Sequence, residues 1–501
     1  MSNNLKNIFI VAFTTLLSRI SGFVRDAIFF SIFGLSEASA AFLFAFTIPN
    51  LFRRLLGEGA LSSAIVPILS GQYVRHGREA VGTLLKQIVI RLSCILLAIV
   101  LVGCFVTFSV SRCSFLGYKW IIGLHFITLV LPYMIFVCTA AVISAALNVL
   151  GYFFAASLNA VWLNLTMVIV LVIGKICKLP EIQKLDLLSF GVIIGGIIQC
   201  LVPIFALCRK IPKSNTEGEK PQDYSKELKE ILHLFWPGFF GAAVTQINLL
   251  ISRSLAYFYS ASSVSVLYLA NRLIELPLGI FAIAISTVFF PDMSKSALNP
   301  ENSSDTLKRS FNQGILFLLW ILLPSALGLF FIKKEILSVF FEWGNFGVSD
   351  TQQILPILSI YCISIPFYGI STFLVRSFHA IKDMRTSVHI GCILLIVNVI
   401  ATVVLMNLFG VPGIASANTI SIILQTYMLY TRLRKKRQDF SIDLNLNKIF
   451  TLLFGLLGIC SIILFGRLFI TSDIYVLLCL TPIAALLYLL ITHHALKSRA
   501  E

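Results

Sequence analysis

The sequence is short of charge for its length. Only 12% of its 501 residues are charged, whereas 58% are hydrophobic and the mean hydropathy is +0.92. This balance excludes an ordinary soluble globular protein. Apolar runs of about 20 residues recur from end to end, each long enough to cross a bilayer as a helix. The chain is therefore predicted to be a polytopic membrane protein without a large soluble domain.

The sequence also lacks the motifs of several enzyme classes. It contains no GxxxxGK[ST] phosphate loop, no HExxH motif and no nucleophile elbow, so neither ATP hydrolysis nor metalloprotease chemistry is indicated. Its 11 cysteines include no CxxC pair and no Cys/His cluster with metal spacing. They are predicted to be apolar filler. We therefore expect no catalytic residue, no metal site and no cofactor.

An all-α fold follows from the continuity of the apolar runs. Strands of a transmembrane barrel would alternate polar and apolar residues over about ten positions, and these runs are continuously apolar. The sequence predicts fourteen transmembrane helices, at residues 7–33, 38–73, 83–109, 122–148, 153–175, 187–208, 232–258, 264–292, 310–332, 352–379, 386–408, 412–432, 447–469 and 474–493.

Basic residues outnumber acidic ones, and the formal net charge is +16. Such an excess can indicate nucleic-acid binding, but here Lys and Arg cluster in short loops between apolar runs, which membrane topology explains better. The predicted inner loops hold about twenty of them and the outer loops about seven. This bias places both chain ends in the cytoplasm, with the first run as a retained span. No nucleic-acid partner is expected.

The longest polar segment divides the chain after the sixth span. It runs from Arg209 to Glu230 and is predicted to be a cytoplasmic linker. The halves on either side resemble each other weakly, because residues 60–70 align with residues 284–294 through shared Ala, Ser and Pro. Repeats of six spans have the same orientation, which predicts two six-helix lobes related by a pseudo-twofold axis. The predicted domains are an N-terminal lobe, a linker, a C-terminal lobe and two additional helices with a cytoplasmic tail, at residues 1–208, 209–231, 232–432 and 433–501.

Charge inside the first two apolar stretches is the feature that most needs an explanation. These stretches contain four arginines and two acids, namely Arg19, Arg25, Arg53, Arg54, Asp26 and Glu58. Exposing four arginines to lipid would cost on the order of 10–14 kcal/mol, at roughly 2.5–3.5 kcal/mol each. They are therefore expected to line a water-filled cavity, to pair internally or to lie near an interface. Because the acids are fewer than the arginines, the set as a whole favours a cationic cavity.

Helical periodicity assigns the charges of the first span to particular faces. Ser18, Gly22 and Arg25 share one face, while Arg19 and Asp26 form a neighbouring stripe. Polar helix segments at membrane depth are tolerated only where they line a cavity or contact protein. The first span is therefore predicted to line the cavity.

The second stretch combines a proline with a polar face. Pro49 removes a helical hydrogen bond, and the residues that fall along one side after it are Asn50, Arg53, Arg54 and Gly57. A break near Gly57 is also consistent with the length of the stretch. Two simpler readings remain for single residues: Arg54 and Glu58 have the i,i+4 spacing of a local ion pair, and an arginine near an interface can snorkel.

The second half adds Arg272 and Glu275, in the eighth span. Their i,i+3 spacing permits either self-neutralisation or a role in the cavity. Arg91 and Arg253 are weaker candidates, because the first is predicted near an inner end and the second can reach an outer surface. A cationic cavity selects anions, and the planar fork of arginine suits phosphate oxygens. Charge alone leaves a lipid-linked diphosphate, a nucleotide and other anionic solutes open.

Six segments resemble the MurJ (MviN) family of lipid II flippases, within the MOP exporter superfamily. The first two listed are specific enough to carry the resemblance alone. The segments are SRISGFVRDAIFFSIFG (18–34), FTIPNLFRRLLGEGALSSAIVPIL (46–69), ANRLIELPLGIFAIAISTVFFPDMSKS (270–296), FEWGNFG (341–347), HAIKDMRTSV (379–388) and GVPGIASANTIS (410–421).

The resemblance implies a fold, a cargo and a set of binding residues. It implies fourteen helices, the last two forming a hydrophobic groove for an isoprenoid tail. The cargo would be lipid II, an undecaprenyl-pyrophosphate-linked disaccharide-pentapeptide that crosses from the cytoplasmic to the periplasmic leaflet of the bacterial inner membrane for peptidoglycan synthesis. The cavity arginines would be Arg19, Arg25, Arg53 and Arg272, surrounded by Ser18, Asp26, Asn50, Arg54 and Glu58.

The resemblance also implies partners and leaves energy coupling open. A monomer is expected, in contact with membrane lipids and with the cell-wall synthesis machinery. Where many relatives carry a carboxylate, this chain has Ala40, Ser252 and Asn271. These replacements argue against sodium coupling and against a fixed acid partner for Arg272, and the sequence does not choose between a coupled ion and the membrane potential.

Two rival functions deserve comparison. A cation-coupled drug exporter of the same superfamily would use acids and aromatic residues rather than surplus arginine. An integral-membrane enzyme acting on lipid-linked sugars would need a carboxylate near an outer loop, and Glu342 and Asp350 are the candidates, without a supporting motif.

Overall fold

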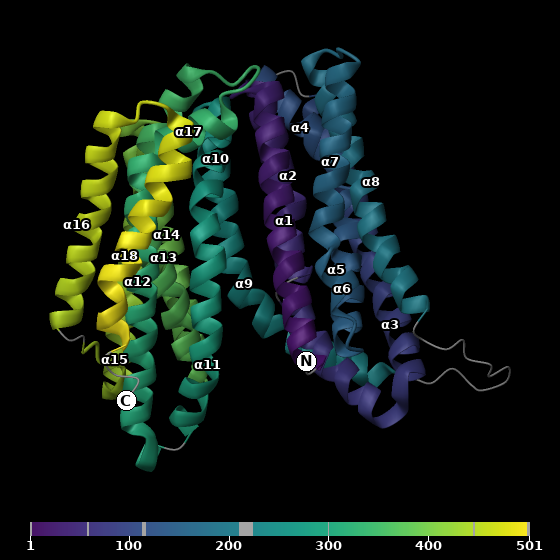
Figure 1. Ribbon diagram of the computed structural model, residues 1–501. Helices are drawn as coiled ribbons and strands as arrows, with labels where there is room; N and C mark the ends of the chain where they lie inside the picture. The colour runs from purple at the N-terminus through teal and green to yellow at the C-terminus, as the bar shows by residue number, and fades with distance from the viewer. Residues whose placement is uncertain are drawn as a thin grey trace, which may run out of the picture. The chain divides into compact units, whose positions relative to one another are not determined.

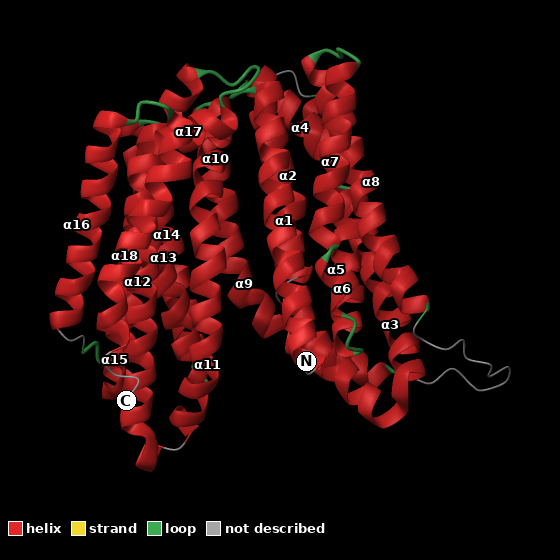
Figure 2. Cartoon of the chain, viewed as in Figure 1, coloured by secondary structure: helices red, strands yellow, loops and turns green. Residues whose placement is uncertain are grey.

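The computed structural model describes residues 3–57, 60–112, 117–209, 224–298, 300–443 and 446–497. Within these ranges every secondary-structure element is a helix (Figure 2). This confirms the predicted all-α fold. The chain divides into two compact units, Met1–Ser265 and Val266–Glu501, and we describe each by itself.

The first unit contains the helices drawn from purple to teal in Figure 1. They are α1 (Asn3–Phe33), α2 (Glu37–Phe52), the π-helix η1 (Arg53–Gly57), α3 (Ala60–Ser111), α4 (Tyr118–Val130), α5 (Tyr133–Val149), α6 (Phe153–Ser157), α7 (Asn159–Ile176), α8 (Glu181–Cys208), α9 (Ser225–Tyr259) and the first residues of α10 (Ala261–Pro277).

The second unit contains the remaining helices, from teal to yellow in Figure 1. After α10 they are the π-helix η2 (Leu278–Ala282), α11 (Ile283–Leu298), α12 (Pro300–Phe341), α13 (Val348–Ala380), α14 (Met384–Phe409), α15 (Val411–Lys436), the 3₁₀ helix η3 (Gln438–Phe440), α16 (Leu446–Phe469), α17 (Asp473–Tyr475), the π-helix η4 (Val476–Leu480) and α18 (Thr481–Lys497).

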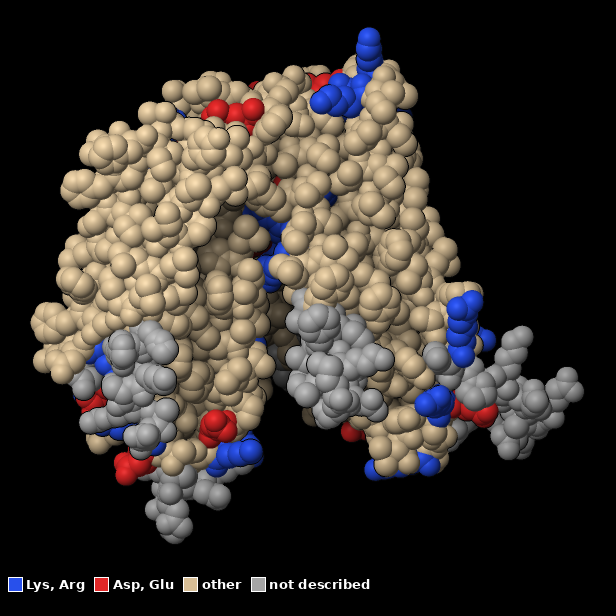
Figure 3. All heavy atoms as spheres, viewed as in Figure 1, with Lys and Arg blue, Asp and Glu red and all other residues tan. Residues whose placement is uncertain are grey.

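The helices have the length and composition of membrane spans. In the described part of the chain, nine are long and apolar enough to cross a membrane, or up to eleven when each of two bent pairs counts as one span. One of the nine, Glu37–Ser111, covers two predicted spans, and Gly77 interrupts it with a positive φ of 77°. Uncharged side chains dominate the surface in Figure 3. The chain is thus a multi-pass membrane protein, and the count of fourteen spans stays a prediction.

Small and aromatic residues alternate in the core of the first unit. Ala40, Ala41 and Ala45 of α2 are at most 1% exposed, and such small side chains let helices approach closely in a membrane. The ring of Phe42 packs against those of Phe29 and Phe46, at centroid distances of 5.8 and 5.9 Å. This packing anchors α1 to α2, the two helices that carry most of the predicted binding residues.

Helix α9 also packs within the first unit. Leu228 and Ile231 belong to the same buried cluster as residues of α3, and Gln72 Nε2 donates a hydrogen bond of 2.9 Å to Glu227 Oε1. The sequence assigned residues 232–258 to the C-terminal lobe, and most of the predicted linker lies at residues 210–223, outside the described ranges. The four-part domain division stays a prediction.

A proline in α12 explains how the last helix is attached. Pro324 has no N–H, so the carbonyl of Trp320, four residues earlier, loses its helical partner. The hydroxyl of Tyr488 on α18 donates to that carbonyl at 2.7 Å, and the Trp320 indole donates to Thr492 Oγ1 at 2.7 Å. A backbone acceptor at membrane depth is thereby satisfied, and α18 is held against α12.

We expect a Gly413→Ala variant to be less stable than the wild type. A Cβ at Gly413 would lie 1.9 Å from the backbone oxygen of Leu405, so α15 would have to move away from α14. Overpacking of this kind costs about 1–3 kcal/mol. The measurement is the thermal unfolding midpoint in detergent, with Gly328→Ala as the control, because a Cβ at Gly328 would meet nothing within 4 Å. Equal midpoints for the two variants would contradict the prediction.

Candidate anion-binding site

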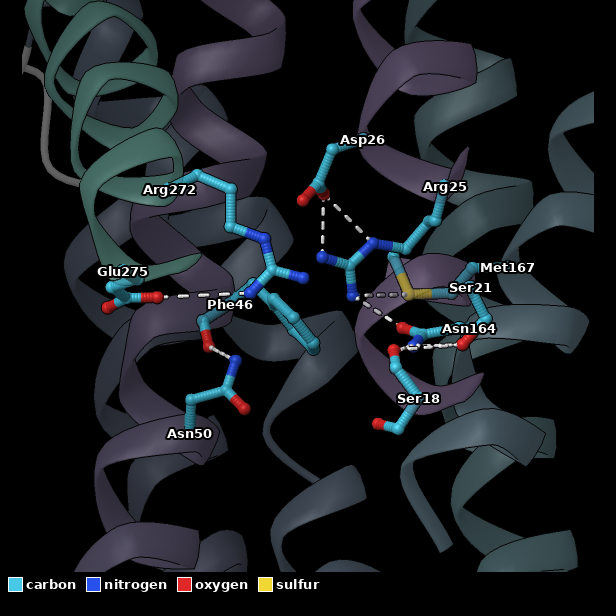
Figure 4. A network of polar contacts seen from close by, with 10 residues as sticks. All are labelled: Ser18, Ser21, Arg25, Asp26, Phe46, Asn50, Asn164, Met167, Arg272 and Glu275. Carbon is cyan, nitrogen blue, oxygen red and sulfur yellow. Dashed lines mark hydrogen bonds and ion pairs between the residues drawn. The ribbon is translucent and has the colours of Figure 1, made fainter. Parts of the chain in front are cut away.

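The best-defined part of the site is the side chain of Arg25 on α1. This residue is only 8% exposed. Its Nε and Nη2 donate to Asp26 Oδ1 at 3.0 and 2.6 Å, so the two neighbouring residues form an ion pair (Figure 4). The sequence placed them on adjacent stripes of one helix, and their side chains meet between those stripes. The pair lowers the cost of holding a guanidinium within the membrane.

Helix α7 supplies a second support for Arg25 that the sequence analysis missed. Arg25 Nη1 donates to Asn164 Oδ1 at 2.9 Å and approaches Met167 Sδ at 3.9 Å. The Asn164 amide in turn donates to Ser21 Oγ at 3.0 Å and to the Ser18 carbonyl at 3.3 Å. Asn164 therefore ties Arg25 and the polar turn of α1 together, as Figure 4 shows. Its sequence signal is an amide within a mostly apolar run, which also contains Asn159 and Thr166.

The second group lies where α2 passes into η1. Arg53 Nε donates to Asn50 Oδ1 at 3.3 Å, and the Asn50 amide donates to the Phe46 carbonyl at 3.0 Å. The helix continues through Pro49, and the irregular segment is the π-helix from Arg53 to Gly57. π-helical turns occur often at functional sites. Here one begins at the first of two consecutive arginines.

Arg253 joins α2 from α9. Its Nη1 donates to Thr47 Oγ1, and Thr47 lies one helical turn before Asn50. The sequence analysis ranked Arg253 as a weak candidate that can reach an outer surface. The structure instead places its guanidinium beside the polar face of α2, where it adds to the positive charge of the first unit.

In the second unit, Arg272 on α10 has a local acid partner. Its Nη1 lies 3.8 Å from Glu275 Oε2 (Figure 4). The Asn271 amide donates to Glu275 Oε1 at 3.0 Å. The side chains of Arg272 and Glu275 are 25% and 37% exposed. The i,i+3 pair considered from the sequence is thus formed, but at a long distance. The amide of Asn271 thus holds the carboxylate of Glu275 and not the guanidinium of Arg272.

The other predicted residues are distributed as follows. Arg19 and Arg54 are half-buried, on α1 and in η1, and Glu58 lies outside the described residues. Arg91 on α3 is exposed. The predicted Arg54–Glu58 pair therefore lies partly outside the described residues.

The two carboxylates considered for an enzyme have structural partners. Glu342 Oε1 accepts a hydrogen bond of 2.6 Å from Thr351 Oγ1, and Asp350 Oδ2 accepts one of 3.2 Å from the backbone N–H of Gly347. Both residues thereby organise the start of α13.

Taken together, the described arginines of the first unit favour an anionic ligand over a cationic one. Arg25, Arg53 and Arg253 bring three guanidinium groups to the polar faces of the first unit, and Asp26 is the carboxylate that pairs with Arg25. Arginine binds phosphate oxygens bidentately. In the described ranges no group of three or more His, Cys, Asp or Glu residues is placed to hold a metal ion. The arrangement can bind and orient a phosphate group.

Replacing Asn164 with alanine is expected to raise the half-saturating concentration of anionic ligand about five- to tenfold. The reason is that Arg25 loses a hydrogen bond worth roughly 1–1.5 kcal/mol. The matched control is Thr166→Ala on the same helix, since the Thr166 hydroxyl bonds only to the Trp162 carbonyl of its own helix. The measurement is the concentration of anionic ligand at half-saturation. An Asn164→Ala variant that matches Thr166→Ala would show that Asn164 does not position Arg25.

Residues 29–485 match the profile of a family described as "Lipid II flippase MurJ". The chain is 30% identical over 441 residues to a probable lipid II flippase MurJ of Vibrio cholerae, covering 85% of this chain and 82% of that protein. It is 31% identical over 449 residues to the Haemophilus influenzae counterpart, covering 84% of each.

Solved structures give the same picture of the fold. A structure titled "Lipid II flippase MurJ, inward closed conformation" matches with a TM-score of 0.80 at 25% identity, covering 98% of this chain and all of that one. An inward-facing multidrug resistance MATE family transporter of the MOP superfamily matches with a TM-score of 0.67 at 13% identity, covering 84% of this chain and 96% of that one. The second likeness concerns the fold alone.

Proposed function

Because the chain belongs to the MurJ family of lipid II flippases, we propose that it moves lipid II across the bacterial inner membrane from the cytoplasmic to the periplasmic leaflet, as a step of peptidoglycan synthesis. The observation that carries the proposal is the buried guanidinium of Arg25, held by Asp26 and Asn164. A held arginine inside an apolar span favours a diphosphate cargo over a neutral or cationic one.

The proposed mechanism is alternating access. The head group enters a cationic cavity that opens inward while the isoprenoid tail stays in lipid, and the two lobes then rock to open the cavity outward. Arg19, Arg25, Arg53 and Arg272 bind the phosphates, and Ser18, Asp26, Asn50, Arg54 and Glu58 surround them. Pre-oriented guanidinium groups support this role, because holding Arg25 and Arg53 by Asp26, Asn164 and Asn50 lowers the entropy cost of binding.

Release requires that one state bind the head group less well than the other. The long Arg272–Glu275 distance of 3.8 Å supports a switch in which Glu275 competes with the phosphates for Arg272. Coupling to a sodium ion or to the membrane potential would add a driving force. Moving one elementary charge through 100 mV is worth about 2.3 kcal/mol, which is enough to bias release.

Topology and partners complete the proposal. The excess of Lys and Arg in the predicted inner loops supports cytoplasmic positions for both chain ends. The protein would act as a monomer that contacts membrane lipids, lipid II and the cell-wall synthesis machinery, and it would use no cofactor and bind no nucleic acid. Drug export is not favoured, since the MATE family transporter shares the fold at only 13% identity.

The proposal is tested by expressing the chain in a bacterium depleted of its own lipid II flippase. An enzyme added outside the cytoplasmic membrane, which cleaves lipid II only in the outer leaflet, reports flipping. We expect growth and outer-leaflet lipid II to be restored. Cells that accumulate lipid II in the inner leaflet despite full expression of the chain would refute the proposal.

A further inference from the structure

Two π-helices of the chain occupy corresponding places in its two halves. The sequence segments that align with each other begin at residues 60 and 284, which are 224 residues apart (284 − 60). The π-helices η1 and η2 begin at Arg53 and Leu278, which are 225 residues apart (278 − 53). π-helical turns are rare and occur often at functional sites. Their recurrence at one place of the predicted repeat indicates a shared role.

Each of these π-helices adjoins an arginine of the proposed binding site. Arg53 is the first residue of η1, and its Nε donates to Asn50 Oδ1 at 3.3 Å. Arg272 lies on α10, six residues (278 − 272) before η2, and α10 runs into η2 without a loop. The direction of each guanidinium relative to the helix that follows therefore depends on the hydrogen-bond register of the π-turn.

A π-turn can change into an α-turn by a shift of one residue. Its backbone hydrogen bonds join residues i and i+5, whereas those of an α-helix join residues i and i+4. The change turns one side of the helix relative to the other by about 100° and moves it by about 1.5 Å, which are the rotation and rise of one residue. An arginine turned through such an angle leaves the helix face on which it binds.

A proline precedes both π-helices and weakens the competing α-helical ladder. Pro277 ends α10 immediately before η2, and Pro49 lies four residues (53 − 49) before η1. Neither proline has an N–H, so the carbonyls of Leu273 and Ala45 lack their α-helical donors. A change of register at these places therefore breaks fewer hydrogen bonds than it would in a regular helix.

Packing on one face holds each π-helix in its present form. In the first unit, Leu55 of η1 is buried in the same apolar cluster as Ala243 of α9. In the second unit, Ala282 of η2 is buried, and a Cβ added to Gly369 of α13 would lie 3.6 Å from its Cβ. The small residues Ala243 and Gly369 let the neighbouring helix approach closely.

Another face of η2 has room to turn. Its residues Ile280 and Phe281 are exposed, as is Ile283 directly after it. The segment Leu278–Ala282 consists of Leu, Gly, Ile, Phe and Ala, so a change of register within η2 moves none of its own side chains that carries a charge. The π form and the α form can therefore lie close in free energy, as a two-state switch requires.

We propose that η1 and η2 are register switches that control the release of the diphosphate. In the π form, Arg53 and Arg272 face the cargo and bind it. In the α form, both arginines turn away, so the affinity falls and the head group leaves. The inference rests on the proposed function, in which a lipid-linked diphosphate is the cargo, and it supplies the state of lower affinity that release requires.

The first test shifts the equilibrium toward the α form with Pro49→Ala and Pro277→Ala, since each substitution restores an α-helical donor and removes the clash of the proline ring. The measurement is the dissociation constant of undecaprenyl pyrophosphate, with the full chain in lipid nanodiscs. We expect each substitution to weaken binding about tenfold. The thermal unfolding midpoint is expected to stay equal or to rise, because the substitution removes a residue that disfavours helix.

Pro356→Ala is the matched control, because Pro356 is an exposed proline inside α13, whose residues 348–380 are all α-helical. We expect its dissociation constant to equal that of the wild type. Equal binding by all three proline variants would overturn the switch. A loss of affinity that is accompanied by a lower unfolding midpoint would overturn it too, because the loss would then reflect damage to the fold.

A second measurement reports the register of η2 itself. Nitroxide labels are attached to Phe281→Cys on η2 and Ile363→Cys on α13, two exposed positions of the second unit, after the native cysteines are replaced. The distance between the labels is measured by pulsed electron–electron resonance. We expect Pro277→Ala to add a second distance, and undecaprenyl pyrophosphate to restore the wild-type one. A distance distribution that is unchanged by the substitution and by the ligand would overturn the switch.

The switch and the proposed function fail separately. Wild-type protein that does not flip lipid II, while Pro277→Ala weakens diphosphate binding and changes the label distance, would refute the proposed function and leave the switch standing. Wild-type protein that flips lipid II, with Pro49→Ala and Pro277→Ala binding as Pro356→Ala does, would refute the switch alone.

Discussion

Replacing Arg25 with alanine is expected to reduce lipid II flipping about 10- to 100-fold. Hydrogen bonds to charged groups contribute roughly 1.5–3 kcal/mol each, and 1.4 kcal/mol corresponds to a factor of ten. The substitution removes a phosphate-binding guanidinium and leaves Asp26 as a buried carboxylate without its ion-pair partner. The pair, which is neutral overall, would then become negatively charged. The measurement is the rate at which lipid II reaches the outer leaflet in depleted cells.

Arg91→Ala is the control for this prediction, because it removes an exposed arginine of α3 by the same substitution. We expect it to flip at the wild-type rate. An additional variant combines Arg25→Ala with Asp26→Asn. It separates the effect of losing phosphate binding by Arg25 from the effect of the Asp26 charge that remains after Arg25 is removed. If flipping returns to the wild-type rate in that double variant, Arg25 serves only to neutralise Asp26.

The second large effect concerns Arg272 and its acid partner, whose variants should act in opposite directions. Arg272→Ala is expected to raise the half-saturating concentration of lipid II about 10-fold or more, through loss of a charge-assisted contact. Glu275→Gln is expected to lower it several-fold, because Arg272 no longer has a competing carboxylate at 3.8 Å. If Glu275 assists release, its variant also has a lower maximal rate.

Both parameters are measured in proteoliposomes at a series of lipid II concentrations. Asn271→Ala serves as a probe of the same pair, because it removes the hydrogen bond of 3.0 Å that holds Glu275 without changing the charge. Glu275→Gln with a raised half-saturating concentration would mean that the pair stabilises the fold of α10 and does not tune the binding of the cargo.

The all-α fold and the family were predictable because both depend on patterns that are local in sequence. Apolar runs of span length identify membrane helices, and arginines such as Arg25 stand out in them because charge is costly there. The pairing of Arg272 with Glu275 was also foreseen as an alternative, since the i,i+3 spacing of one helix determines it.

The support for Arg25 was not predictable from spacing. Asn164 lies 139 residues further along the chain, and only the packing of α7 on α1 brings its amide to the guanidinium. The available signal was an amide within a mostly apolar run, where an amide needs a partner.

The path of the second apolar stretch shows a different limit. Pro49 was expected to disturb the helix, yet the helix passes through it and the π-helix begins four residues later, at Arg53. Proline leaves only one carbonyl without its donor, and neighbouring groups can satisfy it in a membrane protein. A π-helix depends on the register of all of its hydrogen bonds, which residue spacing does not reveal.

The proposal that Arg25, Arg53 and Arg272 bind the diphosphate of lipid II during its transfer across the membrane is tested most directly with purified protein. Proteoliposomes containing lipid II in the inner leaflet would be prepared with wild-type protein, with the Arg25→Ala, Arg53→Ala, Arg272→Ala triple variant and with Arg91→Ala. Head-group transfer is followed over time. We predict transfer with the wild type and Arg91→Ala, and only the protein-free background rate with the triple variant. Transfer at the wild-type rate by a folded triple variant would contradict the account.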